Sequence, residues 1–146
     1  MRPTVTVATI VPREGAFLFV EEQTPEGLRL NQPAGHLEAG ESIVEAARRE
    51  TLEETGWYVR PVTLVGIYRW RAAEGAPTFV RFAFVATPEA HDAGRALDEG
   101  IVRALWLGYD EVAARRAMHR SPLVMRCLDD FRAGASSPLA ILADVA

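Results

Sequence analysis

One segment of the sequence has both of its helix ends marked by their residues. Ser42 is followed three residues later by Glu45, the pattern of a capping box, in which each side chain accepts a hydrogen bond from the other residue's backbone N–H. Gly56 supplies the residue type that most easily adopts the left-handed conformation beyond a helix end. The sequence therefore predicts a helix from about Ile43 to Thr55, with an apolar stripe made of Ile43, Val44, Ala47, and Thr51 or Leu52.

Three glutamates share one face of this predicted helix. Glu50, Glu53 and Glu54 stand at positions i, i+3 and i+4, a spacing at which like charges destabilise an isolated helix. One interpretation is a solvated charged face. The other is a site for a hard cation, because grouped carboxylates bind Mg²⁺ or Mn²⁺ through oxygen. Arg49, next to Glu50, is placed to hold a carboxylate through two parallel hydrogen bonds.

Composition excludes several other kinds of site. The chain has 146 residues, a formal net charge of −4 and a single cysteine, Cys127. One cysteine excludes an internal disulfide and, with only three histidines, a Cys₄ or Cys₂His₂ zinc site. The acidic balance argues against stable nucleic-acid binding through a broad basic surface. All 16 basic residues are arginine, which excludes Schiff-base chemistry at lysine.

The length and hydropathy pattern predict one domain over residues 1–146. No apolar run is long enough to span a bilayer, and the first residues do not resemble a secretory signal. We therefore expect a cytoplasmic protein without a membrane partner, as a monomer or a homodimer.

The rest of the chain mixes strand and helix patterns. Strands are expected at residues 4–11, 16–20, 63–68, 78–85 and 101–107, with the first two forming a hairpin. Residues 24–27 have turn composition, and residues 86–100 are expected to be a polar loop. Helices are expected from Asp110 and from Ser121–Pro122 to Gly134, followed by an apolar tail at 139–142 that packs on the core. This pattern predicts an α/β or α+β sandwich.

The glycine-rich loop and the helix together resemble the Nudix box, a loop–helix–loop motif of diphosphate hydrolases, over residues 35–57. The fixed glycine, glutamate and arginine positions of the motif are matched by Gly35, Glu41, the 49–54 run and Gly56. Thr51 departs from the motif, which prefers a bulky aliphatic residue there; that position faces the core, so the departure concerns packing more than chemistry. The resemblance implies the Nudix fold, a mixed β-sheet sandwiched between α-helices.

Segments outside the box resemble the NudJ-type branch of phosphatases. These are residues 31–38, Trp70, residues 81–84 and residues 120–124. The resemblance implies a small-molecule substrate and release of orthophosphate from nucleoside tri- and diphosphates. It also implies related pyrophosphates as substrates, such as the hydroxymethylpyrimidine precursor of thiamine and thiamine pyrophosphate. The alternatives are a MutT-like (d)NTP pyrophosphohydrolase, which releases a nucleoside monophosphate and pyrophosphate, and a non-catalytic nucleotide-sensing module.

The resemblance also implies the metal ligands. Glu50, Glu53 and Glu54 would hold Mg²⁺, with Mn²⁺ as a substitute, and the backbone carbonyl of Gly35 would lie beside them. A metal-bound water would attack a phosphorus atom.

The general base has two candidate positions. Glu53 is the first, and Asp98 or Glu99, on the loop before the last strand, is the second; a polar turn is the alternative interpretation of that loop pair. Arg49 would complete the catalytic group by fixing a glutamate rotamer.

Five residues are candidates for substrate binding. Arg81 is the best candidate to bind phosphate, because the guanidinium fork suits phosphate oxygens. Trp70 and Tyr68 would stack on a ring of the substrate, and Asn31 and Gln32 would either contact a substrate edge or cap the loop. The alternatives are an outward strand position for Arg81 and core packing for the two aromatic residues.

Overall fold

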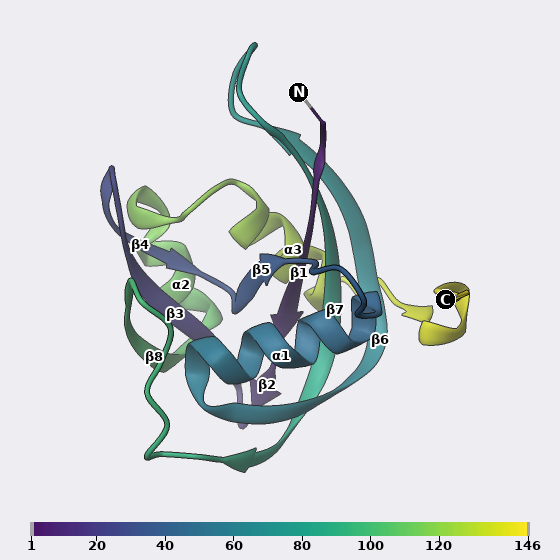
Figure 1. Ribbon diagram of the computed structural model, residues 1–146. Helices are drawn as coiled ribbons and strands as arrows, with labels where there is room; N and C mark the ends of the chain where they lie inside the picture. Colours follow the sequence, from purple (N-terminus) through teal and green to yellow (C-terminus); the bar gives the residue numbers. More distant parts are fainter. Residues whose placement is uncertain (1, 146) are drawn as a thin grey trace.

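Two β-sheets, with helices on and between them, make up the computed structural model, which describes residues 2–145 (Figure 1). The larger sheet has the spatial order β5 (Ala34–His36), β1 (Thr4–Ile10), β7 (Thr78–His91), β6 (Trp57–Arg71) and β9 (Ser137–Pro138). β1 and β7 are parallel and the other pairs are antiparallel. In the second sheet, β3 (Ala16–Thr24) pairs with β2 (Pro12–Arg13), β4 (Gly27–Asn31) and β8 (Ile101–Gly108).

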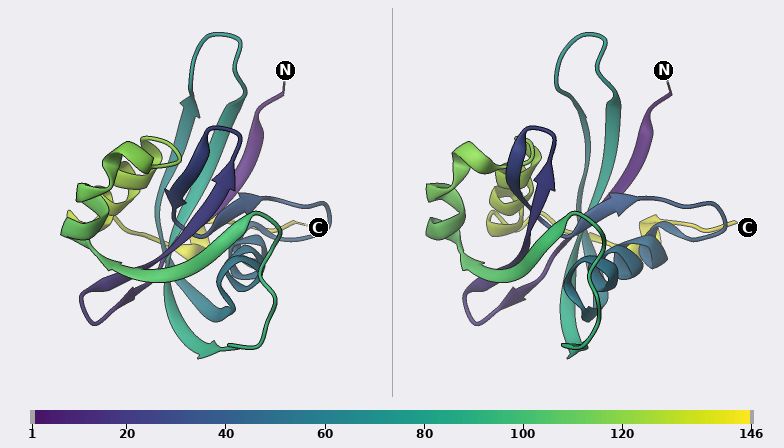
Figure 2. Two further views of the ribbon diagram at one scale, coloured as in Figure 1. Left: turned by 90° about the vertical axis from the view of Figure 1, so that its left-hand side faces the viewer. Right: turned by 60° about the vertical axis from the view of Figure 1, so that its left-hand side comes forward.

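The helices lie on opposite sides of the larger sheet, as Figure 2 shows. α1 (Ile43–Thr55) packs on one face, where Ala46 and Ala47 contact Val7 and Phe84. α2 (Tyr109–Ala114) and α3 (Leu123–Arg132) lie on the other side, together with a 3₁₀ turn at Arg116–Met118; a second 3₁₀ turn, Leu139–Ile141, follows β9. A mixed larger sheet with helices on both of its sides, beside an antiparallel second sheet, confirms the predicted α+β class.

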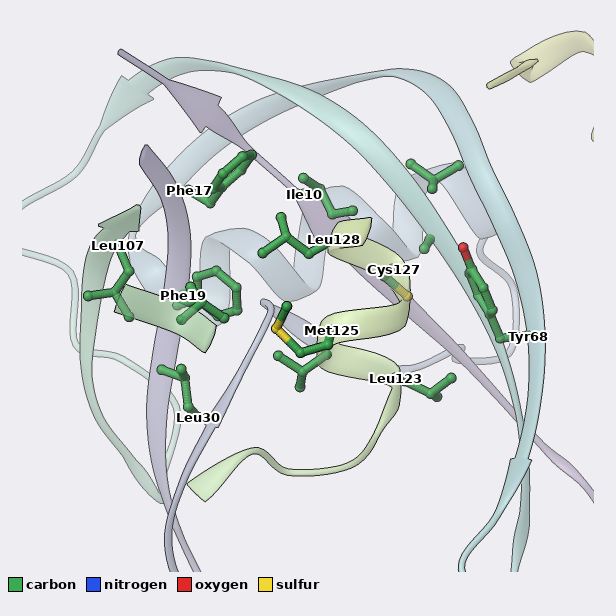
Figure 3. Close-up of a cluster of buried hydrophobic side chains, with 14 residues drawn as sticks. Ile10, Phe17, Phe19, Leu30, Tyr68, Leu107, Leu123, Met125, Cys127 and Leu128 are labelled. Atoms are coloured by element: carbon green, nitrogen blue, oxygen red, sulfur yellow. The ribbon is translucent and has the colours of Figure 1, made fainter. Parts of the chain in front are cut away.

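The main core fills the space between the two sheets (Figure 3). α3 contributes Cys127 and Leu128, which are fully buried. They pack with Phe19 of the second sheet and with Ile10 of the larger sheet. Leu123, the first residue of α3, belongs both to this core and to the lining of a cavity between the two sheets.

The ends of α1 match the sequence prediction. The Ser42 hydroxyl accepts a hydrogen bond from the Glu45 backbone N–H at 3.1 Å, and the Glu45 carboxylate accepts one from the Ser42 N–H at 3.1 Å. Gly56 has φ +76° and donates its N–H to the Leu52 carbonyl at 2.9 Å. The helix therefore begins at Ile43 and ends at Thr55, as predicted.

Thr51 is buried in the contact between α1 and β1. Its hydroxyl donates to the Ala47 carbonyl at 2.8 Å and lies 2.8 Å from the hydroxyl of Thr9. A polar side chain is tolerated at this fully buried position because its hydrogen bonds are satisfied inside the core. The departure from the Nudix motif is thus a packing change, as expected.

Several expected elements differ from the structure. β6 (Trp57–Arg71) and β3 (Ala16–Thr24) run beyond the strands expected at 63–68 and 16–20. The partner of β3 in the first hairpin is the short β2, whereas β1 lies in the other sheet. The expected polar loop at 86–100 begins only after His91, because β7 continues in antiparallel pairing with the start of β6. Pro88, which made that segment look like a loop, lies where the pairing register shifts, a position that tolerates a residue without an N–H donor.

Among the residues that the structure describes, no helix is both long enough and apolar enough to cross a membrane. The apolar tail packs as expected, with Leu139 and Leu142 against the cluster that contains Leu64 and Phe84.

Replacing Gly56 by alanine should destabilise the fold more than the same change at Gly75. Both glycines have positive φ, +76° and +83°, so each substitution carries a backbone cost of about 1–2 kcal/mol. Only at Gly56 would the new Cβ also meet a backbone atom, the Asp92 carbonyl oxygen at 2.9 Å. Urea unfolding of the two variants measures the difference. Equal losses of unfolding free energy would contradict this close packing at the end of α1.

Candidate active site

The guanidinium of Arg49 connects the loop before α1 to the glutamates on the helix. Its Nε and Nη2 donate to the two carboxylate oxygens of Glu41 at 2.9 and 2.7 Å. Its Nη1 donates to Glu50 at 2.8 Å and to Glu53 at 2.9 Å, and its Nη2 also donates to the His36 carbonyl at 3.0 Å. Such charge-assisted bonds fix direction as well as charge. Arg49 therefore acts as a positioning residue for Glu50 and Glu53.

A loop brings a third carboxylate to these two glutamates. The segment between β7 and β8 is joined to the end of α1 by two backbone hydrogen bonds, from Asp92 to Gly56 at 2.8 Å and from Asp98 to Glu53 at 3.0 Å. One carboxylate oxygen from each of Glu50, Glu53 and Asp98 lies within 4.8 Å of the other two. We call these three residues the carboxylate group.

Two of the predicted residues lie outside the carboxylate group. Glu99 lies in the turn that follows Asp98, and only Asp98 of the two has its carboxylate near those of Glu50 and Glu53 and its backbone N–H bonded to Glu53. Glu54 is buried, and its Oε1 accepts a hydrogen bond from the Ala34 backbone N–H at 2.9 Å. Glu54 thus joins α1 to β5, one residue before Gly35.

Glu50 lies directly against the backbone of Gly35. A Cβ built on Gly35 would overlap with the carboxylate carbon of Glu50. Only glycine therefore allows the carboxylate to approach β5 this closely. Gly35 pairs with Val7 of β1, which contacts α1 residues, so the contact lies on the α1 side of the sheet edge.

The carboxylates repel one another in a partly dry environment. Burial raises the pKa of the Glu50 and Asp98 carboxyls, and the negative charge of Glu53 raises the pKa of both further. Burial likewise raises the pKa of Glu54 to about 9. Hydrogen bonds from Arg49 act in the opposite direction and lower the pKa of Glu41. The region therefore gathers more negative charge than Arg49 alone offsets.

These features fit a hard divalent cation. All donors of the carboxylate group are oxygen atoms, which Mg²⁺ and Mn²⁺ prefer over nitrogen or sulfur. A bound cation would also reverse the electrostatic cost of gathering these charges.

A cavity of about 660 Å³ lies on the other side of β5, between the larger sheet and β4. Its lining includes Asn31, Gly35, His36, Trp70, Phe79 and Arg81. Three of the five predicted substrate-binding residues, Asn31, Trp70 and Arg81, are therefore on its wall. Gly35 joins the cavity to the carboxylate group, because it lines the first and lies against Glu50 of the second.

The other two predicted substrate-binding residues lie behind this wall. Gln32 is fully buried, donates its amide N–H to the Val124 carbonyl at 2.8 Å, and accepts a hydrogen bond from Arg81 at 3.1 Å. Tyr68 packs in the main core (Figure 3), and its hydroxyl donates to Asp130 at 2.8 Å. The expectation that Tyr68 stacks on substrate is corrected by this placement, because the ring is already covered by core residues.

Phe79 is a cavity residue that the sequence analysis did not select. Its ring stacks on that of Trp70, with centroids 6.2 Å apart and an angle of 20°. The two-residue spacing between Phe79 and Arg81 could have identified it, because residues two apart on a strand face the same side of the sheet. Glu22 and Arg120 also line the cavity, 3.4 Å apart as an ion pair. No sequence pattern joins those two residues, because only the fold brings them together.

Comparisons with known proteins identify the family of this chain. The pattern of the NUDIX domain family matches residues 1–127. A relative from Escherichia coli K12, Phosphatase NudJ, is 38% identical over 143 residues, covering 98% of this chain and 92% of the relative. A solved NUDIX hydrolase from Nitrosomonas europaea is 50% identical with a TM-score of 0.94, covering 98% of this chain and 97% of that one. A MutT NUDIX hydrolase from Burkholderia pseudomallei, 19% identical with a TM-score of 0.75 over 89% of this chain and 98% of its own, shares the fold.

Replacing Gly35 by alanine should lower kcat by about a hundredfold or more, because the added methyl group displaces the Glu50 carboxylate and small misplacements at a reacting centre have effects of that size. Gly94→Ala is the matched control: its φ is ordinary and the nearest atom to the new Cβ is the Asp92 carboxylate oxygen at 3.8 Å. Steady-state kinetics with circular dichroism on both variants test this. Wild-type turnover in Gly35→Ala would show that the Glu50 position is not needed.

Proposed function

Because the chain belongs to the NUDIX domain family, whose activity is hydrolysis of phosphoric anhydrides, we propose that it is a divalent-metal-dependent phosphatase of nucleoside tri- and diphosphates. In this proposal the enzyme releases orthophosphate. Related pyrophosphates, among them the hydroxymethylpyrimidine and thiamine pyrophosphates, are further candidate substrates. The observation that carries the proposal is the carboxylate group, which adjoins a cavity of substrate size at Gly35. The name of the E. coli relative, a phosphatase, favours orthophosphate as the product.

Glu50, Glu53 and Asp98 would hold the cation, with Glu54 and the Gly35 carbonyl as the remaining candidate ligands. When bound, Mg²⁺ or Mn²⁺ would supply neutralisation of phosphate oxygens and acidification of a water molecule. Arg49 keeps Glu50 and Glu53 in place through its hydrogen bonds. No covalent nucleophile is needed, because phosphoryl transfer depends mainly on positioning and charge neutralisation.

Two carboxylates remain candidates for the general base. Glu53 is the first, since it belongs to the carboxylate group and its side chain is about one third exposed (31%), which leaves it open to water. Of the predicted pair Asp98 and Glu99, Asp98 is the second candidate, a choice supported by its backbone hydrogen bond to Glu53 and its membership of the carboxylate group.

The cavity would hold the rest of the substrate. Trp70 supplies a flat apolar surface for a ring, and Arg81 and Asn31 supply polar contacts from the cavity wall. Gln32 acts on substrate through Arg81, whose guanidinium it helps to hold.

The product assay tests the proposed reaction. With GTP and Mg²⁺, the enzyme should release orthophosphate and GDP, and EDTA should abolish the reaction because the carboxylates would lack their cation. Separate phosphate and pyrophosphate assays measure this. Release of pyrophosphate and GMP would instead establish the MutT-like reaction, and activity that persists in EDTA would contradict the metal requirement.

The carboxylate pair on the loop gives a matched comparison. Asp98→Asn should lower kcat/KM by at least about tenfold, the low end of what removing a supporting group of a metal site costs. Glu99→Gln, one residue later in the exposed turn, should stay close to wild type. A larger loss of kcat/KM in Glu99→Gln than in Asp98→Asn would reverse the assignment.

Glu53→Gln should lower kcat by about 10²–10⁴-fold if Glu53 supplies the base.

A further inference from the structure

Arg81 is a buried cation whose partners in residues 2–145 are all neutral. Only 5% of the residue is exposed. Its guanidinium donates to the side-chain oxygens of Asn31 and Gln32, both at 3.1 Å, and to the Cys127 sulfur at 3.8 Å. None of the ion pairs formed within residues 2–145 involves it. Burying a cation is costly unless its N–H groups are hydrogen-bonded, so its position at a cavity wall points to a ligand that supplies further hydrogen-bond acceptors.

The guanidinium is held in one orientation. Gln32 donates its own amide N–H to the Val124 carbonyl of α3, which turns its oxygen toward Arg81. Three of the five N–H groups of Arg81 donate to residues 2–145, which leaves two for a ligand. A fixed, planar donor pair is suited to two adjacent acceptor atoms lying in one plane.

Arg81 lies far from the carboxylate group. In the larger sheet, Arg81 of β7 is the neighbour of Thr6 of β1, which is the neighbour of His36 of β5. Two strand spacings separate Arg81 from the edge strand, about 10 Å. Glu50 lies beyond that edge, on the α1 side of Gly35. Arg81 therefore meets a part of the substrate that lies farther along the cavity from the carboxylate group.

The neighbouring row of the same sheet face is aromatic. Phe79 is two residues before Arg81 on β7 and pairs with Trp70 of β6, and their rings stack. Both residues line the cavity with Arg81. A flat apolar surface next to a planar pair of donors is the surface that a heteroaromatic ring and its edge would complement.

We propose that Arg81, beside the Trp70–Phe79 pair, selects substrates whose ring edge carries adjacent acceptors, a carbonyl oxygen and a ring nitrogen. The inference rests on the proposed function and narrows its substrate class. An amino group in place of the carbonyl would set donor against donor, so 6-oxopurine nucleotides are preferred over 6-aminopurine nucleotides. This is the pairing by which arginine recognises the O6 and N7 atoms of guanine.

Inosine triphosphate and ATP test the selection, because they carry an oxo and an amino group at the same ring position. Wild-type kcat/KM should be roughly five- to a hundredfold higher for inosine triphosphate, the discrimination typical of a bidentate arginine contact. Replacing N7 of GTP by carbon should remove most of the excess of kcat/KM over that for ATP. Because this test uses the wild-type enzyme, it does not depend on the folding of a variant.

Arg81→Lys should reduce the ratio between the two substrates to about threefold or less, because lysine keeps the charge and lacks the planar fork. The control is Arg103→Lys, at an exposed arginine paired with Glu21 outside the cavity lining, which should keep the wild-type ratio. Circular dichroism checks folding of both variants.

Three outcomes would overturn the inference. The first is an equal wild-type kcat/KM for inosine triphosphate and ATP. The second is a kcat/KM for 7-deaza-GTP that exceeds that for ATP by as much as the value for GTP does. The third is an Arg81→Lys variant whose kcat/KM falls by the same factor for inosine triphosphate and ATP. The last would place Arg81 on phosphate or in a purely structural role. In each case orthophosphate release and its loss in EDTA would still stand, so failure here is distinguishable from failure of the proposed function.

Discussion

The hydrogen bonds of one guanidinium, that of Arg49, hold the candidate active site together. They join Glu41 and the His36 carbonyl on the loop side to Glu50 and Glu53 on the helix. Without such a clamp, carboxylates at this spacing would turn apart toward water, because they repel one another. The clamp compensates their charge only in part, which leaves the carboxylate group suited to a divalent cation.

The candidate site has two parts, which lie on opposite sides of the sheet edge at β5. On the α1 side, the missing side chain of Gly35 admits the Glu50 carboxylate. On the other side, the cavity holds Trp70 and Arg81, whose distance from the edge suits contacts with a part of the substrate that does not react. A substrate lying over this edge would have its phosphates near the carboxylates and its ring in the cavity.

Local signals predicted α1 well and its surroundings less well. The capping box and Gly56 gave the helix bounds, because they act within a few residues of each helix end. The extension of β7 to His91 depends on pairing with β6, which composition around Pro88 conceals. Asp98 and Glu99 were equivalent in sequence, and only the backbone hydrogen bond from Asp98 to Glu53 separates them. Tyr68 and Trp70 were likewise equivalent in sequence as candidates for stacking on substrate. Only the packing of α3 against Tyr68 distinguishes them.

Metal affinity in the absence of substrate tests the central claim most directly. Arg48 and Arg49 are adjacent on α1, and Arg48 is exposed and outside the clamp. We expect a Mn²⁺ titration monitored by electron paramagnetic resonance to show that Arg48→Lys binds Mn²⁺ with the affinity of the wild-type protein. Arg49→Lys should bind roughly ten- to a hundredfold more weakly, the usual effect of losing a residue that orients metal ligands. Equal affinity in the two variants would contradict the claim that Arg49 builds the cation site.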